Sequence, residues 1–258
     1  MNAWQERPRE SSLSAGPEPL RRVGDLQLAF RASVASQADM APSSYPVLPG
    51  DAACAIALPP PGPLPRHGRT LAQLIERRRS GAIAPGPVPP ATWGALLDAA
   101  LEPPLGSRMR MFPEELQPVV FPVVFDFEGV APGAYRHDPV TRQLLPVAAI
   151  ERGRMREDVL LQWDHGGGAA IFFLAVPMAR ILHAYGDRGY KHALMSLGFV
   201  SDRLYLFAEH LGLTYTVTAG FAYTTVDELL GLDGYHYTVP FSFIVGGPRP
   251  PARAATQG

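Results

Sequence analysis

The longest regular pattern of apolar and polar positions in this chain covers residues 188–213 and predicts one long helix. Its apolar side chains recur every three or four residues, which places them on one helical face: Leu194, Leu197, Val200, Leu204, Phe207 and Leu211. The remaining positions are not consistently polar, so we expect the helix to be covered on more than one side. Gly198 lies in mid-helix, where a glycine is unfavourable unless another backbone comes close, and Gly212 is a stop signal.

Shorter periodic segments on either side of this helix predict a mixture of strands and helices. Runs of β-branched and aromatic residues predict strands at 119–127, 133–137, 143–147, 170–176, 214–221 and 237–245. Helical patterns cover residues 70–80, 91–101, 149–163 and 178–185. Capping boxes begin the helix at Thr70 and a further short helix at Thr225, which ends at Gly231.

Length and composition favour one domain with flanking segments. The chain has 258 residues, of which 47% are hydrophobic, and can therefore bury a full-sized core. We expect an N-terminal arm over residues 1–58, a stiff proline-rich spacer over 59–69, a folded domain over 70–247 and a C-terminal tail over 248–258. The arm could be a flexible linker or could wrap a partner subunit, and the sequence favours neither.

Charge and cysteine content argue against several classes of protein. The net charge is −1 and only 18% of the residues are charged, which disfavours binding to nucleic acid or to acidic membranes. The single cysteine, Cys54, excludes an intrachain disulfide framework and suits a reducing cytoplasm. We predict no metal site, because His192 and His210 of the long helix are about 27 Å apart along its axis.

The end of the first helix carries a candidate for chemistry in residues 76–80, Glu-Arg-Arg-Arg-Ser. Arginines at a helix end can simply be solvated charges that complement the helix dipole. Alternatively, the guanidinium groups and the Ser80 hydroxyl bind a phosphate, whose geometry arginine matches well. The residues alone leave both interpretations open.

A series of short motifs follows along most of the chain: AIALPPPGPL, LIERRRS, EGVAPGAYRHDP, YGDRGYKHAL, LYLFAEHLGL, GF and ELLGLDG. Their order resembles that of the nitroreductase-like flavoproteins. The resemblance is greatest to the SagB/McbC-type dehydrogenases, which oxidise azolines to azoles in ribosomally made peptides. Each motif is weak by itself, whereas the ordered series is more specific.

This resemblance implies an α+β fold of the nitroreductase-like type, with a central mixed or antiparallel sheet, flanking helices and the long helix buried at the centre. It also implies that FMN lies at the interface of a homodimer. The cofactor-binding residues that it implies are Arg78, Arg79, Ser80, Gly220 and Arg249, with Arg253 as an alternative to the last.

The same resemblance implies a catalytic role for Tyr185, as the base that removes a proton while a hydride equivalent passes to flavin N5. Relatives carry a lysine beside this tyrosine, whose ammonium group would help the phenol ionise, but this chain has Ala184 there. Lys191 or Arg188 could fold back to replace that charge, so Tyr185 and Lys191 are the catalytic candidates. A second departure is the sequence MFPE at 111–114, where relatives carry a Pro-Ser-Gly-Gly loop against the flavin.

Two classes of function therefore stay open. In the first, the chain is an FMN-dependent dehydrogenase that acts on a peptide-derived azoline or a similar small conjugated substrate, together with partner biosynthetic enzymes. In the second, it has kept the fold but lost FMN and the chemistry, and serves as a partner or scaffold subunit for an active enzyme.

Overall fold

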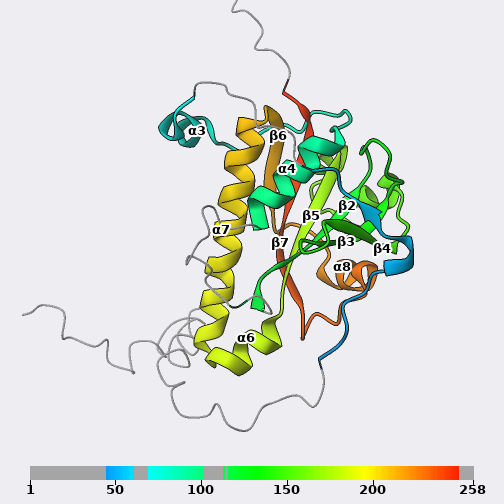
Figure 1. Cartoon of the computed structure of the whole chain (residues 1–258), viewed down its shortest axis with the longest axis vertical. Helices are drawn as coiled ribbons and strands as arrows, with labels where there is room; N and C mark the ends of the chain where they lie inside the picture. The colour runs from blue at the N-terminus through cyan, green and yellow to red at the C-terminus, as the bar shows by residue number, and fades with distance from the viewer. Residues whose placement is uncertain (1–44, 61–68, 102–112, 114–115, 250–258) are drawn as a thin grey trace, which may run out of the picture.

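The protein is described by a computed structural model over residues 45–60, 69–101, 113 and 116–249. Within these residues the strands form one seven-stranded sheet, antiparallel throughout, in the order β1-β4-β3-β2-β5-β7-β6 (Figure 1). The strands are β1 (Ile56–Ala57), β2 (Val119–Val124), β3 (Gly133–Asp138), β4 (Gln143–Ala148), β5 (Ala170–Val176), β6 (Leu213–Thr218) and β7 (Thr238–Pro248).

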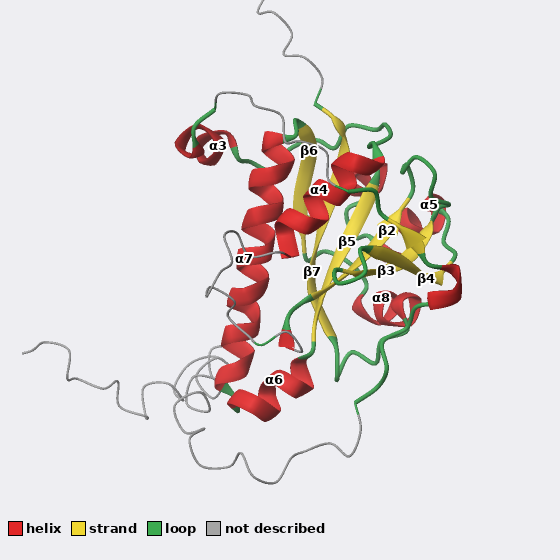
Figure 2. Ribbon diagram, in the orientation of Figure 1, coloured by secondary structure: helices red, strands yellow, loops and turns green. Residues whose placement is uncertain are grey.

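Helices cover both faces of this sheet, as Figure 2 shows. They are α3 (Leu71–Arg77), α4 (Pro90–Leu101), α5 (Arg152–Arg154), α6 (Met178–Tyr185), α7 (Arg188–His210) and α8 (Tyr223–Leu230). One apolar core lies between the sheet and α4, α6 and α7. A second core lies on the opposite face, under α8 and the short helical turns near α5.

Strand β5 connects the two cores because all seven of its residues are buried. Side chains alternate between the faces of a strand. Phe172 and Leu174 accordingly pack in the core beneath α7, while Ile171 and Phe173 pack in the core beneath α8. A continuous apolar run in the sequence therefore corresponds to a strand covered on both sides.

Helix α7 buries one face against the described residues of the chain. Leu197, Val200 and Leu204 are buried as the sequence predicts, but Leu194, which belongs to the same predicted stripe, is 39% exposed. The described residues therefore cover the helix on one side, and cover of a second side stays a prediction. Gly198 is exposed, and a Cβ built there would meet no atom of the described residues within 4 Å, so none of these residues makes the expected close backbone approach.

Two helix predictions need correction on the α8 side of the sheet. The helix expected over 149–163 is divided into α5, a π-helical turn (Met155–Val159) and a 3-10 turn (Trp163–Gly167). The capping box predicted at Thr225 is wrong, because α8 begins at Tyr223 after Ala222 without a side-chain cap.

The capping box at the start of α3 is confirmed. The Thr70 hydroxyl accepts a hydrogen bond from the Gln73 amide, and the Gln73 side chain accepts one from the Thr70 amide. These bonds satisfy amide groups that a helix start leaves without partners. The helix therefore begins at the residue that the sequence indicates.

The predicted flanking segments lie largely outside the described residues. This applies to residues 1–44 of the arm, 61–68 of the spacer and 250–258 of the tail, and also to 102–112. The last part of the predicted arm is described, and it contains β1, which pairs with β4 at one edge of the sheet. Among the described helices, none combines the length and apolarity needed to cross a membrane.

Candidate functional site

The arginines that follow the capping box meet the C-terminal end of α7. Arg77, the last residue of α3, donates from Nε to Oε1 of Glu209 at 3.0 Å. Arg249, which follows β7, reaches the same carboxylate with two nitrogens, Nη1 to Oε1 at 3.3 Å and Nη2 to Oε2 at 2.7 Å. Its backbone amide also donates to the Gly212 carbonyl just after α7. Segments from both ends of the described domain thus converge on one carboxylate.

Glu209 is the buried centre of this cluster, with 1% of its side chain exposed. The hydroxyl of Tyr215, on β6, donates to Glu209 Oε2 at 2.9 Å. Burial alone would raise the pKa of Glu209, but the hydrogen bonds from Arg77, Tyr215 and Arg249 outweigh it and lower that pKa. Burial and the bond to Glu209 raise the pKa of Tyr215 to about 12. The carboxylate is therefore ionised and the phenol neutral at neutral pH.

A second ring of the cluster surrounds Tyr205, which lies one helical turn before Glu209. The Ser80 hydroxyl and the Tyr205 hydroxyl form a hydrogen bond at 2.9 Å. The guanidinium carbon of Arg78 lies 5.0 Å from the centre of the Tyr205 ring, within the range of a cation–π interaction. Arg77, Arg78 and Ser80 therefore all contact the C-terminal part of α7, at Glu209 or Tyr205.

The cluster carries three guanidinium groups, those of Arg77, Arg78 and Arg249, against the one carboxylate of Glu209. Part of this positive charge offsets the negative C-terminal end of the α7 dipole. The rest is open to solvent, since the side chains of Arg77 and Arg249 are 50% and 36% exposed. Exposed guanidinium groups beside a hydroxyl are a donor set that suits a phosphate.

The structure brings together three of the predicted cofactor residues, Arg78, Ser80 and Arg249. Arg79 is exposed between Arg78 and Ser80. Gly220 lies elsewhere, in the loop beyond the far end of β6, where its carbonyl accepts a hydrogen bond from Leu161. Arg253 and the loop at 111–112 and 114 lie outside the described residues.

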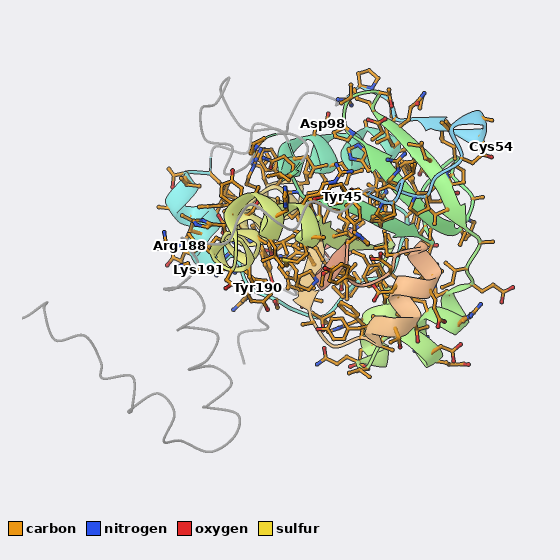
Figure 3. The ribbon with its side chains drawn as sticks, turned by 90° about the horizontal axis from the view of Figure 1, so that it is seen from below. Tyr45, Cys54, Asp98, Arg188, Tyr190 and Lys191 are labelled. Carbon is orange, nitrogen blue, oxygen red and sulfur yellow. The ribbon has the colours of Figure 1, made fainter. Side chains whose placement is uncertain are left out.

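The predicted catalytic residues lie at the other end of α7 from the arginine cluster. Tyr185 ends α6, is partly buried, and has its ring 6.3 Å from that of His192. Lys191 is exposed near the start of α7, beside Arg188 and Tyr190 in Figure 3. The fourteen residues from Lys191 to Tyr205 correspond to about 21 Å of helix. Within one chain the two groups of predicted site residues are therefore separate.

Sequence reasoning missed Glu209, Tyr205 and Tyr215. It included Arg77 in the candidate phosphate motif but not among the cofactor-binding residues that the resemblance implies. No sequence signal marks Glu209 as buried, because it lies outside the predicted apolar stripe. In the structure it shares a helical face with the buried Tyr205, four residues earlier. A carboxylate at such a position needs cationic partners. In the part of the chain that the structure describes, no three His, Cys, Asp or Glu side chains gather as a metal site would require.

The seven-stranded antiparallel sheet with its flanking helices defines an α+β protein of the nitroreductase fold. The sequence model of the nitroreductase family matches residues 76–247, which is most of the chain. The chain therefore belongs to the nitroreductase family. The fold class predicted from the motif series is confirmed.

Individual relatives agree with this assignment. A protein of Methanocaldococcus jannaschii that is named as a nitroreductase is 27% identical over 113 residues, which cover 43% of this chain and 57% of that protein. A crystal structure from Anabaena variabilis, also named as a nitroreductase, aligns with a TM-score of 0.66 and 24% identity over 81% of this chain and 45% of the other. The chain thus spans about half the length of these relatives.

The E. coli microcin synthetase McbBCD complex with truncated pro-MccB17 bound contains a similar fold. It aligns with a TM-score of 0.58 and 24% identity, over 67% of this chain and 70% of the matched chain. Identity at this level establishes the shared fold alone. The SagB/McbC-type resemblance therefore enters the proposal below and not the family assignment.

Proposed function

We propose that the chain is an FMN-dependent oxidoreductase, a dehydrogenase of the SagB/McbC type that oxidises a peptide-derived azoline or a similar small conjugated substrate. The observation that carries the proposal is the convergence of Arg77, Arg78, Ser80 and Arg249 at the end of α7, in a member of the nitroreductase family. The similarity to the microcin synthetase complex, whose structure has truncated pro-MccB17 bound, supports a peptide-derived substrate.

The donor set of the arginine cluster fits the phosphate end of FMN. Arg78 and Ser80 would bind the phosphate directly, and Arg77 and Arg249 would add donors that their bonds to Glu209 hold in place. Bound FMN supplies a two-electron acceptor. On the protein side, Tyr185 would take the proton that leaves the substrate, and Lys191 would supply the positive charge that helps the phenol ionise.

The exposed face of α7 supports a homodimer. Leu194, Met195 and Phe199 are 39%, 48% and 56% exposed and project from the same side of the helix. A contiguous apolar surface of this kind marks a site of interaction with another protein. The exposed Gly198 in its middle would let a second helix approach closely.

The order of residues on this face is self-complementary in an antiparallel pair of helices. If the two-fold axis crosses the helix pair at the level midway between residues 196 and 197, Lys191 of one copy lies opposite Asp202 of the other. In the same register Leu194 lies opposite Phe199, and Met195 lies opposite Gly198. A two-fold interface pairs one patch with itself in this way, so a second copy of this chain is the occupant that the pattern favours.

This pairing would also bring together the two groups of predicted site residues, which are far apart within one chain. In an antiparallel pair, the start of one α7 lies beside the end of the other. Tyr185 and Lys191 of one copy would then approach the arginine cluster of its partner copy, although they are far from the cluster of their own chain. The proposed site is therefore shared between two copies.

The second candidate function is a partner or scaffold subunit without bound FMN. It is favoured by Ala184, which stands where the SagB/McbC-type pattern has the lysine, and by the sequence at 111–114. Ala184 lies on α6, outside the arginine cluster. The property that first separates the two candidates is whether the protein binds FMN.

The decisive experiment is to purify the full chain, add FMN, remove the excess and examine the protein for retained flavin. We expect a yellow protein that releases FMN on denaturation. Arg78→Gln should reduce the amount retained, because it removes one guanidinium group from the phosphate end.

The matched control is Arg154→Gln, since Arg154 is exposed and pairs with Asp158 on α5 and the turn after it, outside the cluster. It should retain FMN as the unmodified chain does. A colourless protein after incubation with FMN would favour the scaffold function. Equal loss of FMN in both variants would show that the arginine cluster is not where FMN binds.

A further inference from the structure

We propose that Glu209 is a positioning residue that assembles the anion site by holding α3 and the segment after β7 against the end of α7. This inference rests on the proposed function and extends it to a residue that does not itself touch the phosphate. Glu209 is 132 residues from Arg77 and 40 residues from Arg249 in the sequence, yet it bonds to both.

Helix α3 depends on these polar contacts because it has little apolar attachment. None of its residues is buried, and its apolar side chains Leu71 and Ile75 are 61% and 53% exposed. The described contacts that join its C-terminal end to the rest of the chain are those of Arg77 with Glu209, and of Arg78 and Ser80 with Tyr205. The position of the arginines is therefore set by α7 rather than by packing of α3.

The bonding pattern of Glu209 leaves donors for a ligand. Arg249 forms a forked pair with both carboxylate oxygens, which fixes the plane of its guanidinium group. Arg77 binds through Nε, and no bond of its two terminal nitrogens to the described residues competes with a second acceptor. The Tyr215 hydroxyl, on β6, donates the second hydrogen bond that Oε2 accepts. Each carboxylate oxygen therefore accepts two hydrogen bonds from the protein, and these bonds fix the orientation of both arginines.

Glu209 also carries a negative charge near the proposed phosphate, so its removal has two opposing effects. Loss of the charge would strengthen the positive field. Loss of the carboxylate would also free two long arginine side chains and release α3, and a ligand would then have to order all three on binding. Arg77 and Arg249 are already 50% and 36% exposed, so solvent screens the gained attraction, and we expect the loss of order to dominate.

The test compares FMN with riboflavin, which has the same ring system but no phosphate. Affinities are measured by titration of flavin fluorescence with the full chain. Glu209→Gln should lower the preference for FMN over riboflavin by about tenfold, the equivalent of one charge-assisted hydrogen bond. Tyr215→Phe, which removes one bond to Glu209 and no charge, should lower it by less. Glu157→Gln, a matched change at an exposed glutamate, should leave it unchanged.

A second readout does not depend on flavin. Trypsin cleavage after residues 77 to 79, identified by mass spectrometry, reports on the release of α3. Glu209→Gln should be cleaved there faster than the unmodified chain and than Glu157→Gln. If cleavage is unchanged, Glu209 does not hold α3 and the inference is overturned.

The outcomes separate this inference from the proposed function. If the unmodified chain does not prefer FMN to riboflavin, the phosphate site itself is wrong, while the cleavage experiment still tests whether Glu209 holds α3. If the chain prefers FMN and Glu209→Gln keeps that preference, Glu209 does not position the site. The same conclusion follows if the affinities for FMN and riboflavin fall together, because that result indicates a general loss of structure.

Discussion

Gly189 and Gly198 lie in the same helix, but only one of them is required by the surrounding structure. A Cβ at Gly189 would lie 2.7 Å from the carbonyl oxygen of Ile181 and 2.8 Å from its Cγ2. The start of α7 therefore packs directly on the backbone of α6. A Cβ at Gly198 would meet no atom within 4 Å in the part of the chain that the structure describes. The sequence shows two glycines in one helical pattern and does not distinguish their roles.

Gly189→Ala should destabilise the fold by about 2 kcal/mol, because overpacking at a tight contact forces the backbone of α6 and α7 apart. Denaturant unfolding measures the change. Gly153→Ala is the matched control, since a Cβ at Gly153 would meet no atom within 4 Å. A loss of stability for Gly189→Ala no greater than for the control would show that α6 can move away at little cost.

Ala184 offers a test of the proposed base. Its side chain is exposed at the end of α6, so a lysine there can be accommodated without displacing the core. An ammonium group beside Tyr185 would help the phenol ionise, so Ala184→Lys should increase the rate of azoline oxidation. The rate is measured by anaerobic bleaching of bound flavin with a thiazoline-containing peptide. Ala184→Gln is the control, and an equal effect of both variants would argue against Tyr185 as the base.

How much of the site could be predicted depends on whether its residues are adjacent in sequence. Arg78 and Ser80 stand in one short motif, so their pattern could suggest a phosphate site. Glu209 and Tyr215 become meaningful only when α7 and β6 bring them to that motif. Such contacts depend on the relative placement of elements, which hydrophobic periodicity does not specify. Arg249 was named through the resemblance, and the structure adds its bond to Glu209.

Among the elements, the predicted helix at 149–163 shows how tertiary partners override a local pattern. The Leu160 amide still bonds to Met155 in a widened turn, but Leu160 then pairs with Phe221, and Leu161 donates to Gly220. The chain therefore leaves the helix in order to pair with the segment after β6. The Ala222 amide bonds to Val159 from the same segment, which fixes where α8 begins. By contrast, α6 and β5 have strong local patterns and were predicted at their observed bounds.

The capping box of α3 should control the stability of that helix locally. Thr70→Ala removes the acceptor for the Gln73 amide and should cost α3 about 1 kcal/mol. Because no residue of α3 is buried, we expect faster hydrogen exchange over residues 71–77 but no change in the global unfolding midpoint. Thr92→Ala, in the first turn of α4, is the control. A lower global midpoint for Thr70→Ala would mean that α3 is part of the main folding unit.

For the whole molecule, we expect His137 to make the largest contribution to the loss of unfolding free energy at acid pH. It is 2% exposed, and burial, with the nearby charge of Arg142, lowers its pKa to about 4 against the opposing effect of Asp138. The unfolded chain therefore binds a proton near pH 6.5 that the folded chain does not bind. Stability should fall as the pH decreases through this interval, by up to about 3 kcal/mol in total.

Replacement of His137 tests this directly. His137→Leu removes the titrating group from a site where neither ring nitrogen has a partner among the described residues. The difference in unfolding free energy between pH 7 and pH 5 should become smaller than in the unmodified chain. His183→Leu, at a partly buried position on α6, is the comparison. An unchanged pH dependence in His137→Leu would place the acid sensitivity elsewhere.

The exposed face of α7 makes the sharpest prediction at the scale of the assembly, because a two-fold interface repeats every contact. If Lys191 of each copy lies opposite Asp202 of the other, Lys191→Glu alone places like charges together twice and should weaken the dimer about tenfold. Asp202→Lys alone should do the same. The double variant restores opposite charges in exchanged positions and should recover the original dissociation constant, measured by sedimentation equilibrium at low salt.

The double variant tests whether the two positions face each other in the dimer, whereas each single variant tests only whether its charge is needed for dimer formation. Phe199→Asp should produce monomers in any arrangement that buries the apolar face, so it tests the interface without testing the register. Recovery in the charge-exchanged variant requires that the two positions face each other across the axis. If each single variant weakens the dimer and the double variant weakens it further, α7 is at the interface in another register. Tyr185 of one copy would then not be brought beside the arginine cluster of the other.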